Sequence, residues 1–214
     1  MGEQSKTRIN SMEYVKVDVR RSQIVQSART VMMRAGVGGL TMRGVAAEAG
    51  IALGTLHYAF PSKELLLKSV IEDVADEIAV VLHQSIDLDG GLEASISTGI
   101  RNFWSALVMS ETNLQLMQYE LSIYAMRTPG LQQIAKDQYE KYCDVVAQWC
   151  QSAADAAGES YPIDFAELAR MIVAGVDGLI LQYLSSANIE RTTADVEILS
   201  VMICGLVRGD RAVV

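Results

Sequence analysis

Residues 41–56, "TMRGVAAEAGIALGTL", constrain the fold more than any other part of the chain. Thr41 is a favoured helix N-cap, and residues 42–48 can form a short helix after it. Gly50 can adopt the left-handed backbone conformation of a tight turn at little cost. A second short helix can then run over residues 53–58, so the stretch predicts two short helices joined by a sharp turn.

The interior positions of these two helices carry the residue types that close packing needs. Val45 and Ala49 are expected to face the core, and Ala46 is small at the point where the helices cross. Ile51 and Leu56 can pack the second helix against the first. Because an arbitrary pair of helices rarely meets all these requirements, the pattern is typical of a helix-turn-helix.

Apolar residues follow helical spacing in the rest of the chain, and strand-like alternation is scarce. A first helix is predicted from Arg20 to Ala35, and Pro61 separates the short helices from a longer one capped by Ser62. Residues 187–194, "ANIERTTA", are expected to form a loop. The later helices, with Pro129 and Pro162 in first turns, are expected at 62–85, 92–109, 111–126, 129–157, 162–187 and 194–207.

The charge of the chain is unevenly distributed. The formal net charge is −8, but residues 1–70 carry ten Lys and Arg against five Asp and Glu, a local charge of +5. Residues 71–214 carry eight Lys and Arg against twenty-one Asp and Glu, a local charge of −13. Such asymmetry indicates a polyanion-binding module joined to a second, acidic part.

The sequence offers little for catalysis, metal binding or secretion. The odd cysteine count and the absence of a signal-peptide apolar core fit a reducing cytoplasm, and the cysteines lack metal-type spacing. His57 has neither a nucleophile nor a carboxylate motif beside it, so no catalytic site is predicted. We therefore expect a protein that is not an enzyme and that holds no cofactor or metal.

One segment, residues 171–189, resembles a membrane span in length and carries a single charge at Asp177. Polar residues such as Gln182 and Asn188 would be costly in hydrocarbon, and no basic flank follows the segment. A helix buried in a protein interface is the favoured interpretation, and no membrane association is expected.

The run from Arg21 to Leu66 resembles the DNA-binding domain of the TetR/AcrR family of bacterial transcriptional regulators. The resemblance covers about a quarter of the chain and implies a homodimer with its N-terminal domain in the major groove. It also implies an all-helical C-terminal domain that holds an effector pocket and the dimer interface. The shared positions, in register without a gap, are Arg21, Ile24, Ala28, Met32, Gly36, Thr41, Val45, Ala46, Ala49, Gly50, Gly54, Thr55, Leu56, Phe60, Lys63 and Leu66.

A recognition helix of about six residues can enter the groove only end-on, so its first residues face bases and its last residues face the backbone. Gly54 permits close approach, and Thr55 offers a hydroxyl and a methyl group to a base edge or a phosphate. Hydroxyl, guanidinium and ammonium groups nearby can donate to phosphates. The candidate DNA contacts are Thr41, Arg43, Gly54, Thr55, His57, Tyr58 and Lys63.

Four positions depart from the family pattern, and they are Ala52, Leu53, His57 and Ala59. Fewer polar groups are therefore expected to face DNA. Base readout could rest on thymine methyls, on Thr55, or on a flexible N-terminal arm, residues 1–18, that carries Lys6, Arg8 and Lys16. Whether the arm contacts DNA, and whether His57 faces DNA or the core, stays open.

Residues 68–214 are expected to hold the effector pocket and the dimer interface. Methionine and aromatic side chains between helices would suit an adaptable apolar ligand site, and a packed core is the alternative. The effector candidates are Trp104, Met117, Tyr124, Tyr142, Trp149 and Met171. The interface candidates, on two apolar helices that can match their symmetry mates, are Ile172, Gly175, Leu179, Tyr183, Leu199 and Ile203.

These features indicate an all-α transcriptional regulator, with residues 19–67 as a three-helix helix-turn-helix DNA-binding domain and a C-terminal helical ligand-binding and dimerisation domain. The interpretation is a cytoplasmic, homodimeric repressor, released from a pseudo-palindromic double-stranded DNA operator by a small-molecule effector. Two alternatives remain: a constitutive DNA-binding protein without an effector, and a helical-bundle ligand carrier or enzyme.

Overall fold

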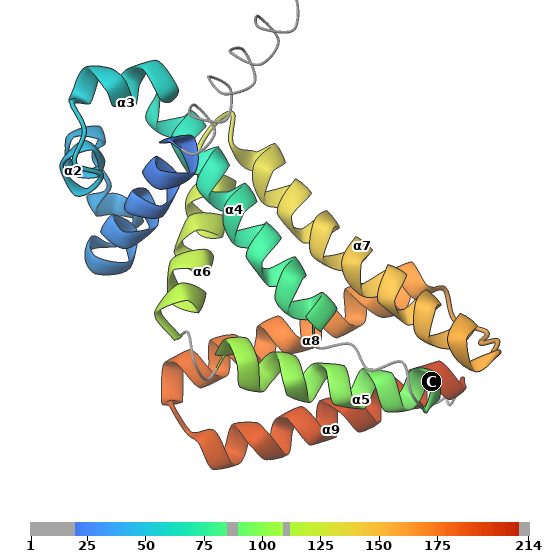
Figure 1. The fold of residues 1–214 in the computed structure, drawn as a ribbon. Coiled ribbons are helices and arrows are strands. Elements are labelled where there is room, and N and C mark those ends of the chain that lie inside the picture. The colour runs from blue at the N-terminus through green and yellow to red at the C-terminus, as the bar shows by residue number, and fades with distance from the viewer. Residues whose placement is uncertain (1–19, 85–89, 109–111, 210–214) are drawn as a thin grey trace, which may run out of the picture. The chain divides into compact units, whose positions relative to one another are not determined.

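The computed structural model describes residues 20–84, 90–108 and 112–209 (Figure 1). These residues are helical apart from short connections, and no strand occurs among them, which confirms the all-α prediction. The proposed arm, residues 1–18 with Lys6, Arg8 and Lys16, lies outside the described residues. After a first helix at 20–35, the elements are η1 (Val37–Gly39), α2 (Met42–Glu48), α3 (Leu53–Ala59), α4 (Lys63–Gln84), α5 (Gly91–Phe103), η2 (Trp104–Val108), α6 (Thr112–Arg127), α7 (Gln132–Ala157), α8 (Phe165–Ser186) and α9 (Ile189–Arg208).

The chain divides into two compact units. The first unit holds the described residues up to Asp73 together with Met117–Ile134. The second unit holds the described parts of Val74–Leu116 and of the chain from Ala135 onward. Helices α4, α6 and α7 therefore each contribute residues to both units.

The helix-turn-helix of the first unit forms as its sequence predicts. The Thr41 hydroxyl caps α2 by accepting a hydrogen bond of 3.0 Å from the Gly44 backbone N–H. Gly50 has a φ of 65° and makes the left-handed turn between α2 and α3. Val45 and Leu56 are fully buried where the two helices meet, so the local signals and the core packing agree.

The connection from α3 to α4 also follows the sequence-based expectation. Phe60 ends α3 with an extended backbone and a fully buried side chain. Ser62 then caps α4, since its hydroxyl accepts a hydrogen bond of 3.3 Å from the Leu65 backbone N–H. The proline break and the serine cap therefore fix where the recognition helix stops and the next helix begins.

Within the second unit, α9 packs against both α5 and α8 (Figure 1). Two glycines allow close approach. The side chain of Trp149 lies so near Gly99 that an added Cβ would be 2.4 Å from its ring. Leu199 lies in the same way against Gly175, at 2.6 Å from an added Cβ. The helix packing of this unit therefore depends on glycines opposite large side chains.

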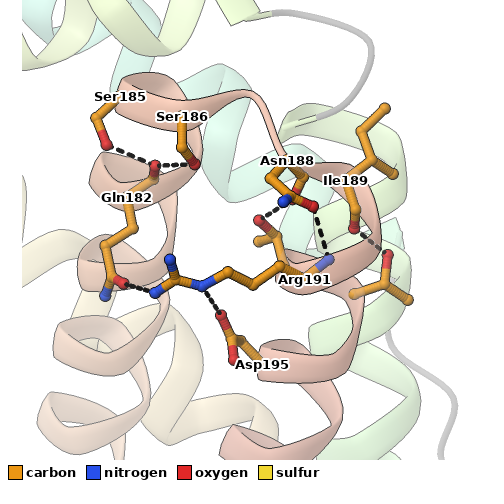
Figure 2. Close-up of polar contacts among 9 residues, drawn as sticks. Gln182, Ser185, Ser186, Asn188, Ile189, Arg191 and Asp195 are labelled. Carbon is orange, nitrogen blue, oxygen red and sulfur yellow. Dashed lines mark hydrogen bonds and ion pairs between the residues drawn. The ribbon is translucent and has the colours of Figure 1, made fainter.

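The prediction of a loop at residues 187–194 was wrong. Helix α9 begins at Ile189, directly after Ala187 in the left-handed region (φ 49°) and the N-cap Asn188. The Asn188 side chain accepts a hydrogen bond of 3.0 Å from the Arg191 backbone N–H (Figure 2). One asparagine cap thus makes a two-residue connection sufficient.

Three further helix boundaries differ from those expected. Pro129 and Pro162 are not in first turns, because α7 begins at Gln132 and α8 at Phe165. The start of α8 is set by Asp164, whose carboxylate accepts a hydrogen bond of 2.9 Å from the Ala166 backbone N–H. The helix expected at 92–109 changes into a π-helix at Trp104.

Among the described helices, α8 is long and apolar enough to cross a membrane by length and composition alone, with a mean hydropathy of 1.3. Only 28% of its most apolar window is buried within the single chain. The interpretation of this segment as an interface helix therefore needs a partner that covers its open surface.

Candidate nucleic-acid interface

The first helix holds the C-terminal ends of both helix-turn-helix helices. The Arg21 guanidinium donates a hydrogen bond of 2.7 Å to the Ala59 carbonyl and lies 4.3 Å from the centre of the Phe60 ring. Gln23 donates to the Ala49 carbonyl at 3.3 Å. A cation at the C-terminal end of α3 also complements the helix dipole. These contacts fix the direction in which α3 presents its other end.

The free surface of α3 carries the side chains predicted to contact DNA. Tyr58 is 87% exposed, although it is a large aromatic residue. His57 is also exposed, so it does not belong to the packed core. Gly54 is exposed, and an added Cβ would meet nothing within 4 Å among the described residues. Thr55 lies half-buried beside it. The start of α3 therefore exposes backbone without a bulky side chain, and its end exposes side chains that can form hydrogen bonds.

Cationic side chains lie at the first turns of the helices on either side of α3. Arg43 is exposed in the first turn of α2, next to the cap residue Thr41, which is itself exposed. Lys63 is the first residue of α4, and its ammonium lies 5.6 Å from the centre of the Tyr124 ring. The first turns of α2 and α4 thus each carry a positive side chain that can donate to a phosphate.

The Glu64 carboxylate, next to Lys63, is bound at this end of α4. The pKa of the Glu64 carboxyl is lowered, first by hydrogen bonding to its own backbone N–H, then by the Ser62 hydroxyl and by the Lys63 charge. Its carboxylate is therefore held mainly by the helix terminus. This leaves the Lys63 ammonium facing the aromatic ring of Tyr124.

Helix α6 supplies a second contact to the N-terminal residues of the first unit. The Glu120 carboxylate accepts a hydrogen bond of 3.0 Å from the Val37 backbone N–H at the start of η1. Gly36 precedes this contact with a φ of 71°, and an added Cβ there would lie 3.3 Å from a Glu120 oxygen. The turn after the first helix is thus shaped both by a glycine and by a carboxylate 83 positions away.

Sequence reasoning missed three residues that shape this interface. Arg21 was part of the family pattern, but its bond to the end of α3 was not foreseen. Glu120 was not a candidate for the DNA-binding surface, and Tyr124 was an effector candidate. No local sequence signal links Glu120 or Tyr124 to the helix-turn-helix, because the contacts depend on the tertiary fold.

The structure separates the six effector candidates. Trp104, Tyr142 and Trp149 are buried in the second unit, whereas Met171 is 45% exposed. Trp104 lies edge-on to Tyr183 at 6.0 Å between ring centres. The buried Trp149 indole N–H has no hydrogen-bond partner among the described residues. Met117 and Tyr124 belong to the first unit.

An acidic and aromatic cluster connects α7 and α8 within the second unit. Tyr139 and Tyr142 lie edge-on, with their ring centres 6.0 Å apart. Burial raises the pKa of Tyr139, and the Asp177 carboxylate, which accepts a hydrogen bond from its hydroxyl, raises it further. Burial also raises the pKa of Tyr142, to which Gln138 donates at 2.9 Å. Asp177 therefore places negative charge beside two tyrosine rings.

The six dimer candidates divide into two sets. Ile172, Tyr183 and Ile203 are buried in the core of the second unit, so they have little surface to offer a partner. The other three are partly exposed and line an open groove of about 240 Å³ between α8 and α9. The residues of this α8–α9 groove are Gly175, Leu179, Gln182, Arg191, Asp195, Ile198, Leu199 and Met202.

One end of the α8–α9 groove is polar (Figure 2). The Arg191 guanidinium donates to the Gln182 side-chain oxygen at 3.2 Å and lies 3.5 Å from an Asp195 carboxylate oxygen. The other end exposes Ile198 and Met202, the latter at 63%. The groove thus combines a polar end, whose charges are paired within the chain, with an apolar end that no described residue covers.

No group of three or more His, Cys, Asp and Glu side chains in the described ranges is arranged to hold a metal ion. Burial raises the pKa of the Cys150 thiol to about 12. This thiol therefore stays protonated at neutral pH and packs as a small apolar group.

The fold and the exposed recognition helix define a helix-turn-helix DNA-binding protein with a helical C-terminal part. Residues 24–70 match the bacterial regulatory proteins of the tetR family, and residues 101–209 match the tetracyclin repressor-like C-terminal domain. The second match alone spans half of the 214 residues. The chain belongs to the TetR family of transcriptional regulators, whose members are not enzymes.

Two similar curated proteins are also regulators. The nicotine-responsive transcriptional repressor HdnoR of Paenarthrobacter nicotinovorans is 26% identical over 169 residues, which cover 79% of this chain and 86% of that protein. The transcriptional regulator YfiR of Bacillus subtilis is 27% identical over 164 residues, 76% of this chain and 79% of that protein.

Solved structures agree with the fold. Salmonella enterica GusR superposes with a TM-score of 0.71 at 22% identity, over 88% of this chain and 95% of that chain. The multidrug binding protein EbrR, solved with ethidium, superposes with a TM-score of 0.65 at 25% identity, over 86% of this chain and 98% of that chain.

Proposed function

We propose that this TetR-family chain is a homodimeric repressor that binds a pseudo-palindromic DNA operator and leaves it when a small-molecule effector binds. The observation that carries the proposal is the exposed face of α3, where Tyr58 and His57 point to solvent after the open backbone at Gly54. Such a face buries poorly in a core but suits a groove lined with phosphates and base edges. The similarity to the repressor HdnoR supports repression.

DNA contacts are assigned from the positions of the exposed groups. Gly54 and Thr55 face base edges, and His57 and Tyr58 face the backbone near the end of α3. Arg43 and Lys63 each donate to a phosphate. Thr41 caps α2 and adds a hydroxyl to the same surface. All of these proposed contacts lie within residues 19–67.

The dimer forms through the α8–α9 groove and the apolar side chains around it. Open apolar surface of this kind marks an interaction site, and α8 is only 28% buried over its most apolar window. A two-fold axis would place the same groove from each copy face to face. A cover of this type accounts for the hydropathy of α8 without a membrane, which fits a cytoplasmic regulator.

The effector binds in the C-terminal part, residues 68–214, and is an aromatic nitrogen compound. HdnoR responds to nicotine and EbrR binds ethidium, and both ligands are of this kind. In this chain, the Asp177 carboxylate beside Tyr139 and Tyr142 suits a cationic or protonated amine. The unpartnered N–H of Trp149 suits a ligand that accepts a hydrogen bond.

Operator binding is tested by fluorescence anisotropy with a palindromic fragment from the region upstream of the protein's own gene. Tight, salt-sensitive binding to this fragment, exceeding that to a scrambled fragment, is the expected result. Equal affinity for both fragments would rule out a sequence-specific repressor. Tight binding that no effector reverses would favour a constitutive DNA-binding protein.

Effector binding is tested separately and without DNA, because ethidium intercalates into duplexes. Nicotine and ethidium are titrated by calorimetry into the wild-type protein, Asp177→Asn and Asp144→Asn. Asp144 is an exposed carboxylate on α7 and serves as the charge-matched control. We expect Asp177→Asn alone to weaken binding, by about tenfold or more. Equal loss in both variants would argue against a direct contact with Asp177.

A further inference from the structure

The contact between Lys63 and Tyr124 joins a DNA-facing helix terminus to a helix distant in sequence. Lys63 begins α4, and Tyr124 lies in the part of α6 that belongs to the first unit. The ammonium is 5.6 Å from the ring centre, within the range of a cation–π interaction. Both residues are half-buried, so the contact is partly shielded from water and the ammonium remains accessible to a ligand.

An aromatic partner and a carboxylate partner have different effects on a lysine that binds phosphate. A carboxylate would neutralise the ammonium and compete with phosphate for its N–H groups. A ring face attracts the cation weakly and leaves its formal charge and its donors available. The lysine is thus restrained and still free to donate, which is the condition for preorganised binding.

The restraint matters because lysine is a flexible side chain. Its rotamer freedom is lost when the ammonium is fixed on a phosphate. The Glu64 carboxylate is bound mainly at the helix terminus, and the ring of Tyr124 lies beside the Lys63 ammonium. Loss of the ring would therefore release the lysine before DNA arrives.

We propose that Tyr124 is a positioning residue for DNA binding, whose ring holds the Lys63 ammonium where it donates to a phosphate at the start of α4. This inference rests on the proposed DNA-binding function. It gives Tyr124 a role in the DNA-reading surface in place of a contact with the effector. The ring, and not the hydroxyl, carries the effect.

The test uses full-length Tyr124→Phe, Tyr124→Leu, Lys63→Met and the Tyr124→Leu/Lys63→Met double variant. Affinity for the operator and for a scrambled duplex is measured by fluorescence anisotropy at several salt concentrations. Met126→Ala, an exposed apolar change two residues along α6, is the matched control. Thermal unfolding is recorded for each variant so that loss of fold is detected.

We expect Tyr124→Leu to weaken binding to both duplexes by about 5-fold to 30-fold, since both half-sites of a dimer lose the contact. Tyr124→Phe should bind within about twofold of the wild type, because phenylalanine keeps the ring face. The salt slope of Tyr124→Leu should stay near the wild-type value, because Lys63 keeps its charge. In the Lys63→Met background, Tyr124→Leu should have less than about a twofold effect.

Three results would overturn the proposal. In the first, Tyr124→Phe is as weak as Tyr124→Leu, which assigns the effect to the hydroxyl. In the second, the effects of Tyr124→Leu and Lys63→Met multiply, which shows that the residues act independently. In the third, Tyr124→Leu binds like Met126→Ala. Absence of operator binding by the wild-type protein would instead defeat the proposed function itself.

Discussion

Helices α3 and α9 both expose large side chains, but the chemistry of the two surfaces is opposite. The exposed end of α3 carries Tyr58 and His57, whose polar groups can donate or accept hydrogen bonds. The exposed side of α9 carries Ile198 and Met202, which do not. The first surface therefore needs a polar partner, and the second needs an apolar one.

This difference predicts opposite responses to salt. Binding through phosphates releases counterions and weakens steeply as salt rises. Apolar association is nearly insensitive to moderate salt and is strengthened by sulfate. The two surfaces can thus be separated by variants that damage one association and leave the other intact.

The largest effect is expected from a charge in the apolar end of the α8–α9 groove. Met202→Glu would bury an unpaired carboxylate twice across a two-fold axis, at about 3–5 kcal/mol each. The variant should be monomeric at micromolar concentration by analytical ultracentrifugation and should still unfold in one cooperative thermal transition. It should also lose specific operator binding, because the two half-sites are no longer read together.

The matched control is Ile123→Glu, which places the same charge at a 54% exposed isoleucine on α6. This variant should remain dimeric. If Met202→Glu also remained dimeric, the α8–α9 groove would not be the interface.

The second prediction concerns the phosphate contacts. Arg43→Ala and Lys63→Ala should each weaken binding to all sequences and reduce the salt slope by about one unit per half-site, since each removes one phosphate contact. Salt titrations of anisotropy check this result. Lys136→Ala removes a cation paired with Glu140 at 3.3 Å in the second unit, and it should change neither quantity.

The third prediction uses substitutions at two glycines to separate effects on folding stability from effects on dimer affinity. Gly99→Ala should lower the free energy of unfolding by about 1–3 kcal/mol, because its Cβ would meet the rigid Trp149 ring at 2.4 Å. Gly175→Ala meets the end of the flexible Leu199 side chain and should cost less than about 1 kcal/mol. Gly175→Ala should still alter dimer affinity, because both residues line the groove.

Urea unfolding and sedimentation of the same samples measure both quantities for the two glycine variants. A larger unfolding penalty for Gly175→Ala than for Gly99→Ala would contradict this assignment of core and groove.

The smallest effect is expected at the α2 cap. Thr41→Ala removes the bond to the Gly44 backbone N–H and should destabilise the chain by about 1 kcal/mol. Thr41→Ser keeps a hydroxyl and should lie between alanine and the wild type in urea unfolding. If Thr41→Ala changed stability no more than Thr41→Ser, the cap would contribute nothing.

The helix-turn-helix could be predicted from sequence because its signals are local. A cap at Thr41, a turn at Gly50 and a small residue at Ala46 lie within ten positions. The start of α9 was missed, although Asn188 was a local signal, because the polar run after it was taken for a loop. Single caps can outweigh the composition of a segment.

Which faces of α8 and α9 are buried within the chain could not be predicted in the same way. Both helices carry apolar residues on several faces, so the sequence indicates an interface without showing which residues the chain covers itself. Ile172 and Ile203 proved buried, whereas Ile198 is exposed. Lys63 was predicted at a phosphate, but its aromatic neighbour Tyr124 is 61 positions away and is brought near only by the tertiary fold.

The division of α6 has a practical consequence for building hybrid regulators. Residues 117–134 fold with the DNA-reading unit, where Glu120 holds the start of η1 and Tyr124 faces Lys63. The first unit, which contains the helix-turn-helix, is therefore not one continuous segment of the chain. A chimera that transplants only the first 73 residues would leave both contacts behind, and a transplant of operator specificity must carry the α6 segment with it.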